Sequence, residues 1–269
     1  MPLRSIVLIP AHGAGLDEAL ASAADAIAFT LAGTTVAVAE LRRLACDGLA
    51  RVTAAGKSGF AIVNHPRTQM LRDDAAALVG PNLRGVLLPH AVDPQDVRDL
   101  AVVLREFELQ RGMEPGDIAA FPIIDTARGV LRAEEIVHAA PRVGGLVFDS
   151  ASYARDIGAR QEEHGPRLSF ARGAVVAASR AFEKRPLVAA GSLQSSHLAQ
   201  YGFAGAVIVD ARTVAQVNAA FTPSSAALEV ARAQAQAYDE ARTRGAWVAS
   251  LGPQVVDAHT ARKARQSLE

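Results

Sequence analysis

The sequence predicts a (β/α)8 barrel, in which eight parallel strands close into a cylinder with helices between them. Two observations predict it. Short apolar runs of strand length alternate with helical segments almost from end to end, and there are eight such runs. Alternation of this kind is typical of parallel strands joined by crossover helices. A doubly wound open sheet is the alternative, but eight regular units favour closure.

The expected strands are short and rich in apolar residues, as buried strands are. In chain order they are Ser5–Ile9, Ala26–Leu31, Phe60–Val63, Gly85–Leu88, Ala119–Ile124, Gly145–Phe148, Leu187–Ala190 and Ala206–Val209. The segments between them have apolar residues at helical spacing. These expected helices are Asp17–Ala24, Val38–Ala54, Thr68–Val79, Pro94–Gln110, Arg132–Ala140, Arg172–Glu183 and Ser195–Tyr201.

The chain after the eighth strand is expected to leave the barrel. Ala211–Ala220 forms the last barrel helix, and a break follows at which Ser224 can cap a long helix, Ser225–Arg244. We therefore expect a barrel domain over residues 1–221 and a C-terminal helical extension over residues 222–269. The extension needs another surface to pack on, either the barrel's own or that of a neighbouring subunit.

Composition narrows the function classes. The chain has 269 residues, half of them hydrophobic, which is enough for one large core. Lysine plus arginine and aspartate plus glutamate each number 28, and this balance disfavours a nucleic-acid or membrane-surface binder. The single cysteine, Cys46, excludes an internal disulfide. No apolar run reaches the roughly 18 residues of a membrane span, so we expect a cytoplasmic protein.

The most informative stretch follows the fifth expected strand. That strand ends abruptly in Asp125, Thr126, Ala127, Arg128 and Gly129, and a helical segment comes next. Asp125 is therefore expected where a strand emerges into a loop, which is the ligand-binding face of parallel α/β proteins. The alternative is that Asp125 only caps the turn and that Arg128 is a solvated surface charge.

Short motifs accompany the expected strands in order along the chain. They are Arg4-Ser5 with Pro10 at the first strand, Val63-Asn64 at the third, Leu88-Pro89 after the fourth and Asp125-Thr126-Ala127-Arg128-Gly129 after the fifth, followed by Phe221-Thr222-Pro223-Ser224 and Val255-Val256-Asp257. This order resembles the citrate lyase beta-subunit-like branch of the HpcH/HpaI aldolase family, which carries R-S-x-x-x-x-P at its first strand, V-x-V-N at its third, L-P-K after its fourth and E-T-A-R-G after its fifth. The resemblance covers essentially the whole chain. It implies a TIM barrel, a cyclic homo-oligomer (a trimer or hexamer), and cleavage or formation of a carbon–carbon bond in an acyl-CoA or 2-keto-acid carboxylate.

The resemblance also implies roles for individual residues. It places a Mg²⁺ (or Mn²⁺) ion on Asp125 and on the residue at position 152, which is Ser152 here, and it gives Arg4 the carboxylate of the substrate. The expected substrate-binding residues are Arg4, Asn64, Thr126 and Arg128. From the residues alone two alternatives stay open: Arg4 pairs with a nearby acid and braces the barrel, and Arg128 turns outward as a helix-start charge.

Several positions depart from the family pattern. Asp125 stands where the family has glutamate, and Ser152 stands where it has the second metal-binding acid. Ala32-Gly33 replace an acidic pair of the family, Ile62 replaces an arginine, and His90 and Ala206 each replace a lysine. One shortened carboxylate holds Mg²⁺ weakly, and the lost charges remove much of the enolate stabilisation. Two functions therefore stay open: a divergent lyase, or a non-catalytic relative that binds a small carboxylate or acyl-CoA, or supports a complex.

Three histidines follow expected strands. His12 comes after the first strand, His65 after the third and His90 after the fourth. In a closed barrel these loops share one rim with Asp125, so the three imidazoles could converge there and suit Zn²⁺, Fe²⁺ or Mn²⁺ better than Mg²⁺. In that site His90 would join Arg4 and Asp125 as a catalytic residue, acting as acid or base. The alternative is three unrelated loop histidines.

Overall fold

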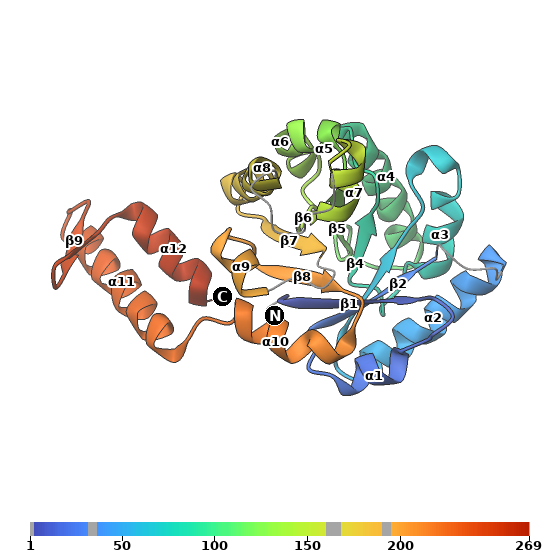
Figure 1. The fold of residues 1–269 in the computed structure, drawn as a ribbon, viewed down its shortest axis with the longest axis horizontal. Coiled ribbons are helices and arrows are strands. Elements are labelled where there is room, and N and C mark those ends of the chain that lie inside the picture. Colours follow the sequence, from blue (N-terminus) through green and yellow to red (C-terminus); the bar gives the residue numbers. More distant parts are fainter. Residues whose placement is uncertain (1–2, 32–36, 160–167, 190–194, 269) are drawn as a thin grey trace. The chain divides into compact units, whose positions relative to one another are not determined.

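A computed structural model describes residues 3–31, 37–159, 168–189 and 195–268, and it confirms the closed barrel (Figure 1). All eight strands run parallel and pair in chain order, and the first pairs with the eighth, which rules out the open sheet. The strands are β1 Ser5–Pro10, β2 Ala26–Thr30, β3 Ser58–Ile62, β4 Gly85–Leu88, β5 Ala119–Ile124, β6 Gly145–Asp149, β7 Arg185–Ala189 and β8 Gly205–Ile208. Ala32, Gly33 and Ala190, which are named above, lie outside the described residues.

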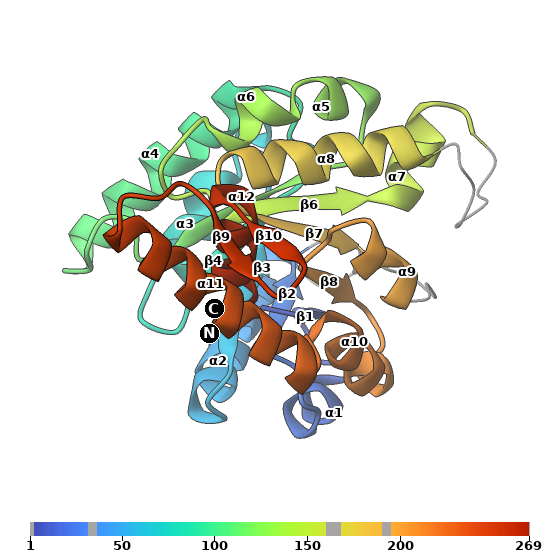
Figure 2. The same cartoon turned by 90° about the vertical axis from the view of Figure 1, so that its left-hand side faces the viewer.

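Helices surround the barrel, and Figure 2 shows α4, α6 and α8 side by side along one flank. The barrel helices are α1 Leu16–Ala21, α2 Val38–Ala54, α3 Leu71–Leu78, α4 Pro94–Gln110, α5 Ala127–Leu131, α6 Ala133–Val137, α7 Ser150–Asp156, α8 Ser169–Ala181, α9 Ser195–Gln200 and α10 Val214–Phe221, with 3-10 turns η1 Pro66–Thr68 and η3 Ala211–Thr213. The expected helix Arg132–Ala140 corresponds to α6, and the short helix α5 precedes it. Helix α5 begins earlier because Thr126 caps it, its Oγ1 accepting from the N–H of Gly129 at 3.0 Å.

The barrel interior is filled by layers of side chains contributed by alternate strands, as expected for this fold. Strand alternation assigns the uppermost layer, nearest the carboxyl ends of the strands, to the odd-numbered strands. Its members are Leu8, Ile62, Ile123 and Ala189, which are partly buried and pack against the interior cluster below. We call these four residues the mouth floor. The layers beneath it are closed by buried side chains such as Leu87, Phe121 and Val147.

Buried ion pairs brace the opposite, amino-terminal end of the barrel. The carboxylate of Glu108, at the end of α4, is fully buried and accepts from the Arg142 guanidinium at 2.7 and 2.9 Å. It also accepts from the N–H groups of Gly116 and Ile118, each at 3.0 Å. Burial alone would raise the pKa of Glu108, but the bonds from Arg142 and the two N–H groups outweigh it and lower that pKa.

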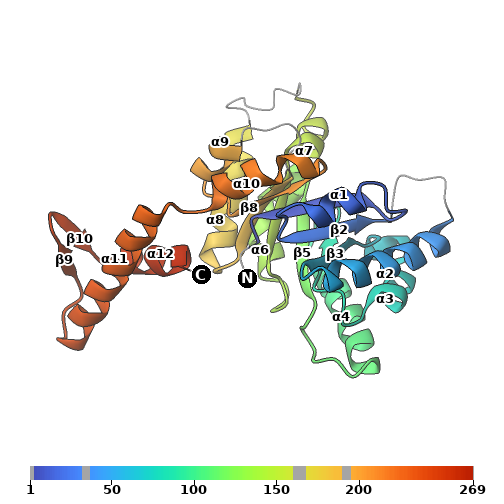
Figure 3. The same cartoon turned by 90° about the horizontal axis from the view of Figure 1, so that it is seen from below.

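The rest of the chain, Thr222–Glu269, forms a separate compact unit. Figure 3 shows its two helices, α11 Ser225–Thr243 and α12 Ala258–Leu268, joined by a hairpin of β9 Ala249–Leu251 and β10 Gln254–Val256, which the sequence had not predicted. Ser224 caps α11, its hydroxyl accepting from the N–H of Ala227 at 3.2 Å. Tyr238, Val256 and Ala261 make the small core of this unit. No helix in the described parts of the chain is both long and apolar enough to cross a bilayer.

Candidate functional site

The carboxyl ends of β4 and β5 bring His90 and Asp125 together. Nδ1 of His90 lies 2.9 Å from Oδ2 of Asp125. The Asp125 side chain is only 11% exposed, whereas the His90 side chain is 69% exposed. A carboxylate can only accept a hydrogen bond, so it holds the imidazole proton on Nδ1 and leaves Nε2 as the basic nitrogen. This is how a base and the acid that orients it are arranged in acid–base catalysis.

The loop that carries His90 is held in an unusual conformation. His90 has φ 58°, in the left-handed region that non-glycine residues seldom adopt, at a cost of about 1–3 kcal/mol. Three hydrogen bonds offset that cost: the N–H of Ala91 donates to the Ile123 carbonyl at 3.1 Å, and the next two N–H groups donate to Asp96 at 3.2 and 3.0 Å. Gly129 leaves space for the loop, because a Cβ there would lie 2.8 Å from the Ala91 carbonyl oxygen.

Two buried oxygens at the carboxyl ends of β5 and β6 lack partners among the described residues. Oδ1 of Asp125 and Oγ of Ser150 are both buried, and neither has a hydrogen-bond partner among the described residues. They follow neighbouring strands, since Ile124 of β5 is in register with Phe148 of β6. An unpaired buried carboxylate oxygen fits a hard cation or an ordered water. Asp149 is next in register to Asp125 and supplies a further carboxylate, and Mg²⁺ commonly takes one or two carboxylates plus waters.

Ser152, the expected second metal ligand, is engaged by neighbouring side chains. Its hydroxyl donates to Oδ2 of Asp149 at 2.7 Å and accepts from Arg155 at 2.9 Å. Asp149 also caps α7, accepting from the N–H groups of Ala151 and Ser152 at 3.0 and 3.1 Å. The sequence had not predicted α7, although an aspartate directly before a small-residue run is a common cap signal. Metal binding by Ser152 remains a prediction without support from these contacts.

The predicted cluster of three histidines does not form. In the described parts of the chain, no group of three His, Cys, Asp or Glu side chains could hold a metal. His65 caps η1, its Nδ1 accepting from the N–H of Arg67 at 3.2 Å, and its Nε2 lies 3.5 Å from Asp96. His12 is exposed. Of the two alternatives that the sequence left open, the structure favours three unrelated loop histidines, because shared rim position does not set loop conformation and η1 turns His65 toward α4.

Arg4 lies at the other end of the barrel, which corrects its predicted place beside Asp125. It precedes β1, and its carbonyl accepts from the N–H of Ala206 at the start of β8 at 2.8 Å. Its guanidinium donates hydrogen bonds to the Asp25 carboxylate from Nε at 3.0 Å and from Nη2 at 2.7 Å. Because all strands are parallel, residues before β1 and after β5 occupy opposite ends. Burial would raise the pKa of Asp25, but the bonds from Arg4 outweigh it and lower that pKa. Arg4 braces the barrel.

The other three expected substrate-binding residues also have structural partners. The backbone and side-chain N–H groups of Asn64 donate to Asp74 on α3 at 2.7 and 2.8 Å. Thr126 caps α5. Arg128 is exposed, and its Nη2 lies 3.4 Å from Asp93, as expected for an outward-turned charge at a helix start. Substrate contact by these residues stays a prediction.

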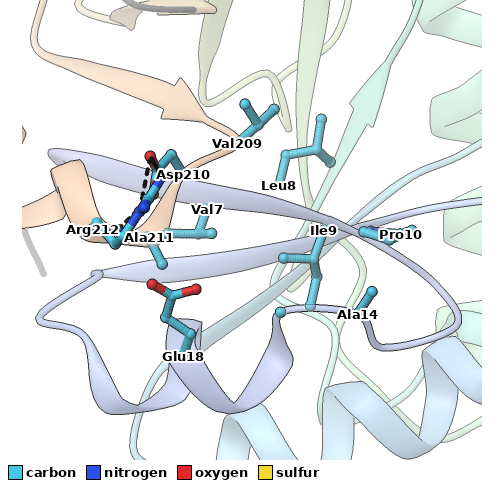
Figure 4. Close-up of a pocket in the computed structure, with 11 residues that line it drawn as sticks. Val7, Leu8, Ile9, Pro10, Ala14, Glu18, Val209, Asp210, Ala211 and Arg212 are labelled. Carbon is cyan, nitrogen blue, oxygen red and sulfur yellow. Dashed lines mark hydrogen bonds and ion pairs between the residues drawn. The ribbon is translucent and has the colours of Figure 1, made fainter.

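A cavity of about 400 Å³ lies at the carboxyl ends of β1 and β8, across the barrel from β4 and β5 (Figure 4). Leu8 of the mouth floor and Val209 line it, together with Val7 and Ile9, which belong to the cluster between the strands and the helices. Its charged lining consists of Glu18, Asp210 and Arg212, and Arg212 is paired with Asp210 at 2.8 Å. Its lining residues come from three separate segments of the chain.

The chain is similar to known proteins along its length. The model of the family described as HpcH/HpaI aldolase/citrate lyase matches residues 7–214. The chain is 28% identical to citrate lyase subunit beta of Escherichia coli strain K12, covering 97% of this chain and 91% of that protein. It is 29% identical to a (3S)-malyl-CoA thioesterase of Cereibacter sphaeroides, covering 99% of this chain and 94% of that protein.

Solved structures show the same fold. CitE of Mycobacterium tuberculosis, in complex with magnesium, acetoacetate and coenzyme A, matches with a TM-score of 0.68 at 22% identity, over 99% of this chain and 97% of that one. A citrate lyase of Burkholderia xenovorans LB400 matches with a TM-score of 0.79 at 13% identity, over 99% and 90%. At these identities the likeness concerns the fold and not the chemistry.

Proposed function

The chain belongs to the HpcH/HpaI aldolase/citrate lyase family, and on that premise we propose that it is a carbon–carbon lyase acting on an acyl-CoA or 2-keto-acid type of carboxylate. The observation that carries the proposal is the His90–Asp125 pair at the carboxyl end of the barrel. In cleavage, Nε2 of His90 would take the proton of the substrate hydroxyl. The carbon–carbon bond then breaks, the hydroxyl carbon becomes a carbonyl, and the bond's electron pair forms an enolate that His90 reprotonates on carbon.

The relatives support the substrate class. One is named for malyl-CoA, and a structural neighbour was solved with coenzyme A and acetoacetate. Malyl-CoA and acetoacetate each have a carbonyl next to a carbon on which an enolate can form. The exposed imidazole of His90 beside a buried acid supplies the acid–base group that such a reaction needs.

A divalent ion, Mg²⁺ or Mn²⁺, is part of the proposal, and a structural neighbour contains magnesium. Asp125 would hold it through Oδ1, which has no protein partner among the described residues, and Asp149 is the further carboxylate by strand register. When bound, the ion stabilises negative charge on the substrate oxygen. His90 and its loop keep their role of moving the proton.

We also propose a homo-oligomer, a trimer or a hexamer, in which the extension over residues 222–269 packs on the barrel or on a neighbouring subunit. The extension exposes apolar side chains, among them Trp247, Val248 and Val255, which supports a further contact surface. Light scattering should give a mass of three or six times 28.1 kDa. A monomer at micromolar concentration would contradict this part of the proposal.

The second candidate function is a non-catalytic relative that binds a small carboxylate or acyl-CoA. It is favoured by the position of Arg4 at the opposite end of the barrel, where it pairs with Asp25, by the engagement of Ser152 by Asp149, and by Ile62 in the mouth floor. The mouth therefore lacks two cations and a metal ligand that the family resemblance implies there, which reduces the stabilisation of an enolate.

Calorimetry separates the two functions. Mg²⁺ and Mn²⁺ are titrated, with and without oxaloacetate or pyruvate, into wild type, Asp125→Ala and the control Asp73→Ala, an exposed acid on α3. Metal binding that is lost only in Asp125→Ala, followed by metal-dependent turnover of acyl-CoA or 2-keto acids, supports the lyase. Ligand binding without any turnover on such a panel favours the binding protein.

A further inference from the structure

The mouth floor offers a substrate only hydrocarbon. Leu8, Ile62 and Ile123 are partly exposed there with Ala189, and Val209, directly after β8, is 70% exposed beside them. A carboxylate placed on this layer would lose water without gaining a hydrogen-bond donor from the floor, which is unfavourable. A hydrocarbon group would gain from the same burial.

The charges around the adjoining cavity also disfavour a carboxylate. Glu18 and Asp210 line it together with a single guanidinium, Arg212, among the described residues. That guanidinium already contacts both oxygens of Asp210, through Nε at 2.9 Å and Nη2 at 2.8 Å. Arg212 lowers the pKa of Asp210, which stays ionised at neutral pH. Figure 4 shows Glu18 and the Asp210–Arg212 pair in the lining. Two acids and one paired base together repel a second carboxylate.

The strand order places the apolar floor between the two polar sites. His90 and Asp125 follow β4 and β5, whereas the cavity lies at β8 and β1, half a turn around the barrel. A substrate whose carbonyl lies at His90 therefore extends over the floor toward a cavity of about 400 Å³, which has room for a chain of several carbon atoms.

We infer that this protein selects substrates whose far end is an uncharged hydrocarbon chain and not a second carboxylate. The inference rests on the proposed function, and it names Leu8, Ile62, Ile123 and Val209 as the residues that set the specificity. The chemical class is a monocarboxylic 2-keto acid or an acyl thioester with an alkyl chain, seated on the mouth floor and ending in the cavity.

The test compares two ligands that share a 2-keto-acid end and differ at the other end. Calorimetry with Mg²⁺ present is run with 2-oxoglutarate, which ends in a carboxylate, and with 2-oxohexanoate, which has an ethyl group in its place. Wild type should bind 2-oxohexanoate at least tenfold more tightly. From 2-oxobutyrate to 2-oxohexanoate the affinity should rise about fourfold for each added methylene.

Ile62→Arg supplies a charge test of the floor. This variant should bind 2-oxoglutarate more tightly and 2-oxohexanoate more weakly than wild type, whereas Val102→Arg, on an exposed position of α4, should change neither affinity. The chain-length series on wild type needs no variant and stands if Ile62→Arg does not fold.

The outcomes separate this inference from the proposed function. If both ligands bind only when Asp125 is intact and 2-oxoglutarate binds more tightly, the site is real and the inference about its substrate is wrong. If neither ligand binds wild type, the inference is overturned, and metal-dependent turnover of acyl-CoA substrates decides the proposed function separately. A flat response to chain length would also overturn the inference.

Discussion

Nδ1 of His90 lies 2.9 Å from Oδ2 of Asp125, although the two residues are 35 positions apart and follow different strands. The acid is buried and the imidazole is exposed, so the pair presents one basic nitrogen to solvent. The loop conformation of His90, supported by Asp96 and Gly129, keeps the imidazole within reach of the acid.

Removing either member of this pair should reduce turnover strongly. His90→Gln and Asp125→Asn each lose proton transfer, which is worth about 10²- to 10⁴-fold in rate. Initial rates on the best acyl-CoA or 2-keto-acid substrate measure the loss, and His138→Gln, an exposed histidine on the outer surface, serves as the control. Turnover of His90→Gln equal to that of wild type would show that another group moves the proton.

Gly129→Ala should damage the site from a distance. The added Cβ would lie 2.8 Å from the Ala91 carbonyl oxygen, so the loop that carries His90 must shift. Misplacement of a catalytic group by about 1 Å costs on the order of 10²-fold in rate. The matched control is Gly173→Ala on α8, where the new Cβ meets no atom within 4 Å and the helix gains about 1 kcal/mol. Full activity in Gly129→Ala would mean that the loop tolerates the shift.

Arg4→Met should weaken the fold and leave ligand binding unchanged. The variant loses the two-atom contact with Asp25, and hydrogen bonds to charged groups contribute about 1.5–3 kcal/mol to the free energy of unfolding. Urea denaturation measures this loss, and calorimetry should give ligand affinities within about twofold of wild type. A tenfold loss of ligand affinity with unchanged stability would show that Arg4 binds the substrate.

The same ion pair predicts a pH dependence of stability. The folded-state pKa of Asp25 is lowered, because the bonds from Arg4 outweigh burial. Its stabilising contribution is therefore complete above the unfolded carboxyl pKa of about 3.9, and it is lost as the pH falls through the lower folded value. Wild type should exceed Asp25→Asn in free energy of unfolding at pH 7, with the difference shrinking below about pH 4. A difference that stays constant down to pH 3 would contradict this assignment.

Local patterns predicted the elements well where each signal was contained within one segment. The bounds of α2, α4, β4 and β5 agree with the expected ones, because apolar spacing and a start signal such as Asp93-Pro94 lie within the segment itself. Helix α7 and the hairpin β9–β10 were missed. Both are short, and packing against neighbouring elements stabilises them more than their own residues do.

The sequence by itself determined the barrel, the break after Phe221 and the placing of Asp125 at the end of a strand, since periodicity and turn residues act over a few positions. Only the tertiary structure decided which side chains meet. Closure of the barrel joins His90 to Asp125 at one end and Arg4 to Asp25 at the other, and loop conformation turns His65 away. Contacts between distant segments depend on the register of all eight strands together, and no single stretch of sequence contains that information.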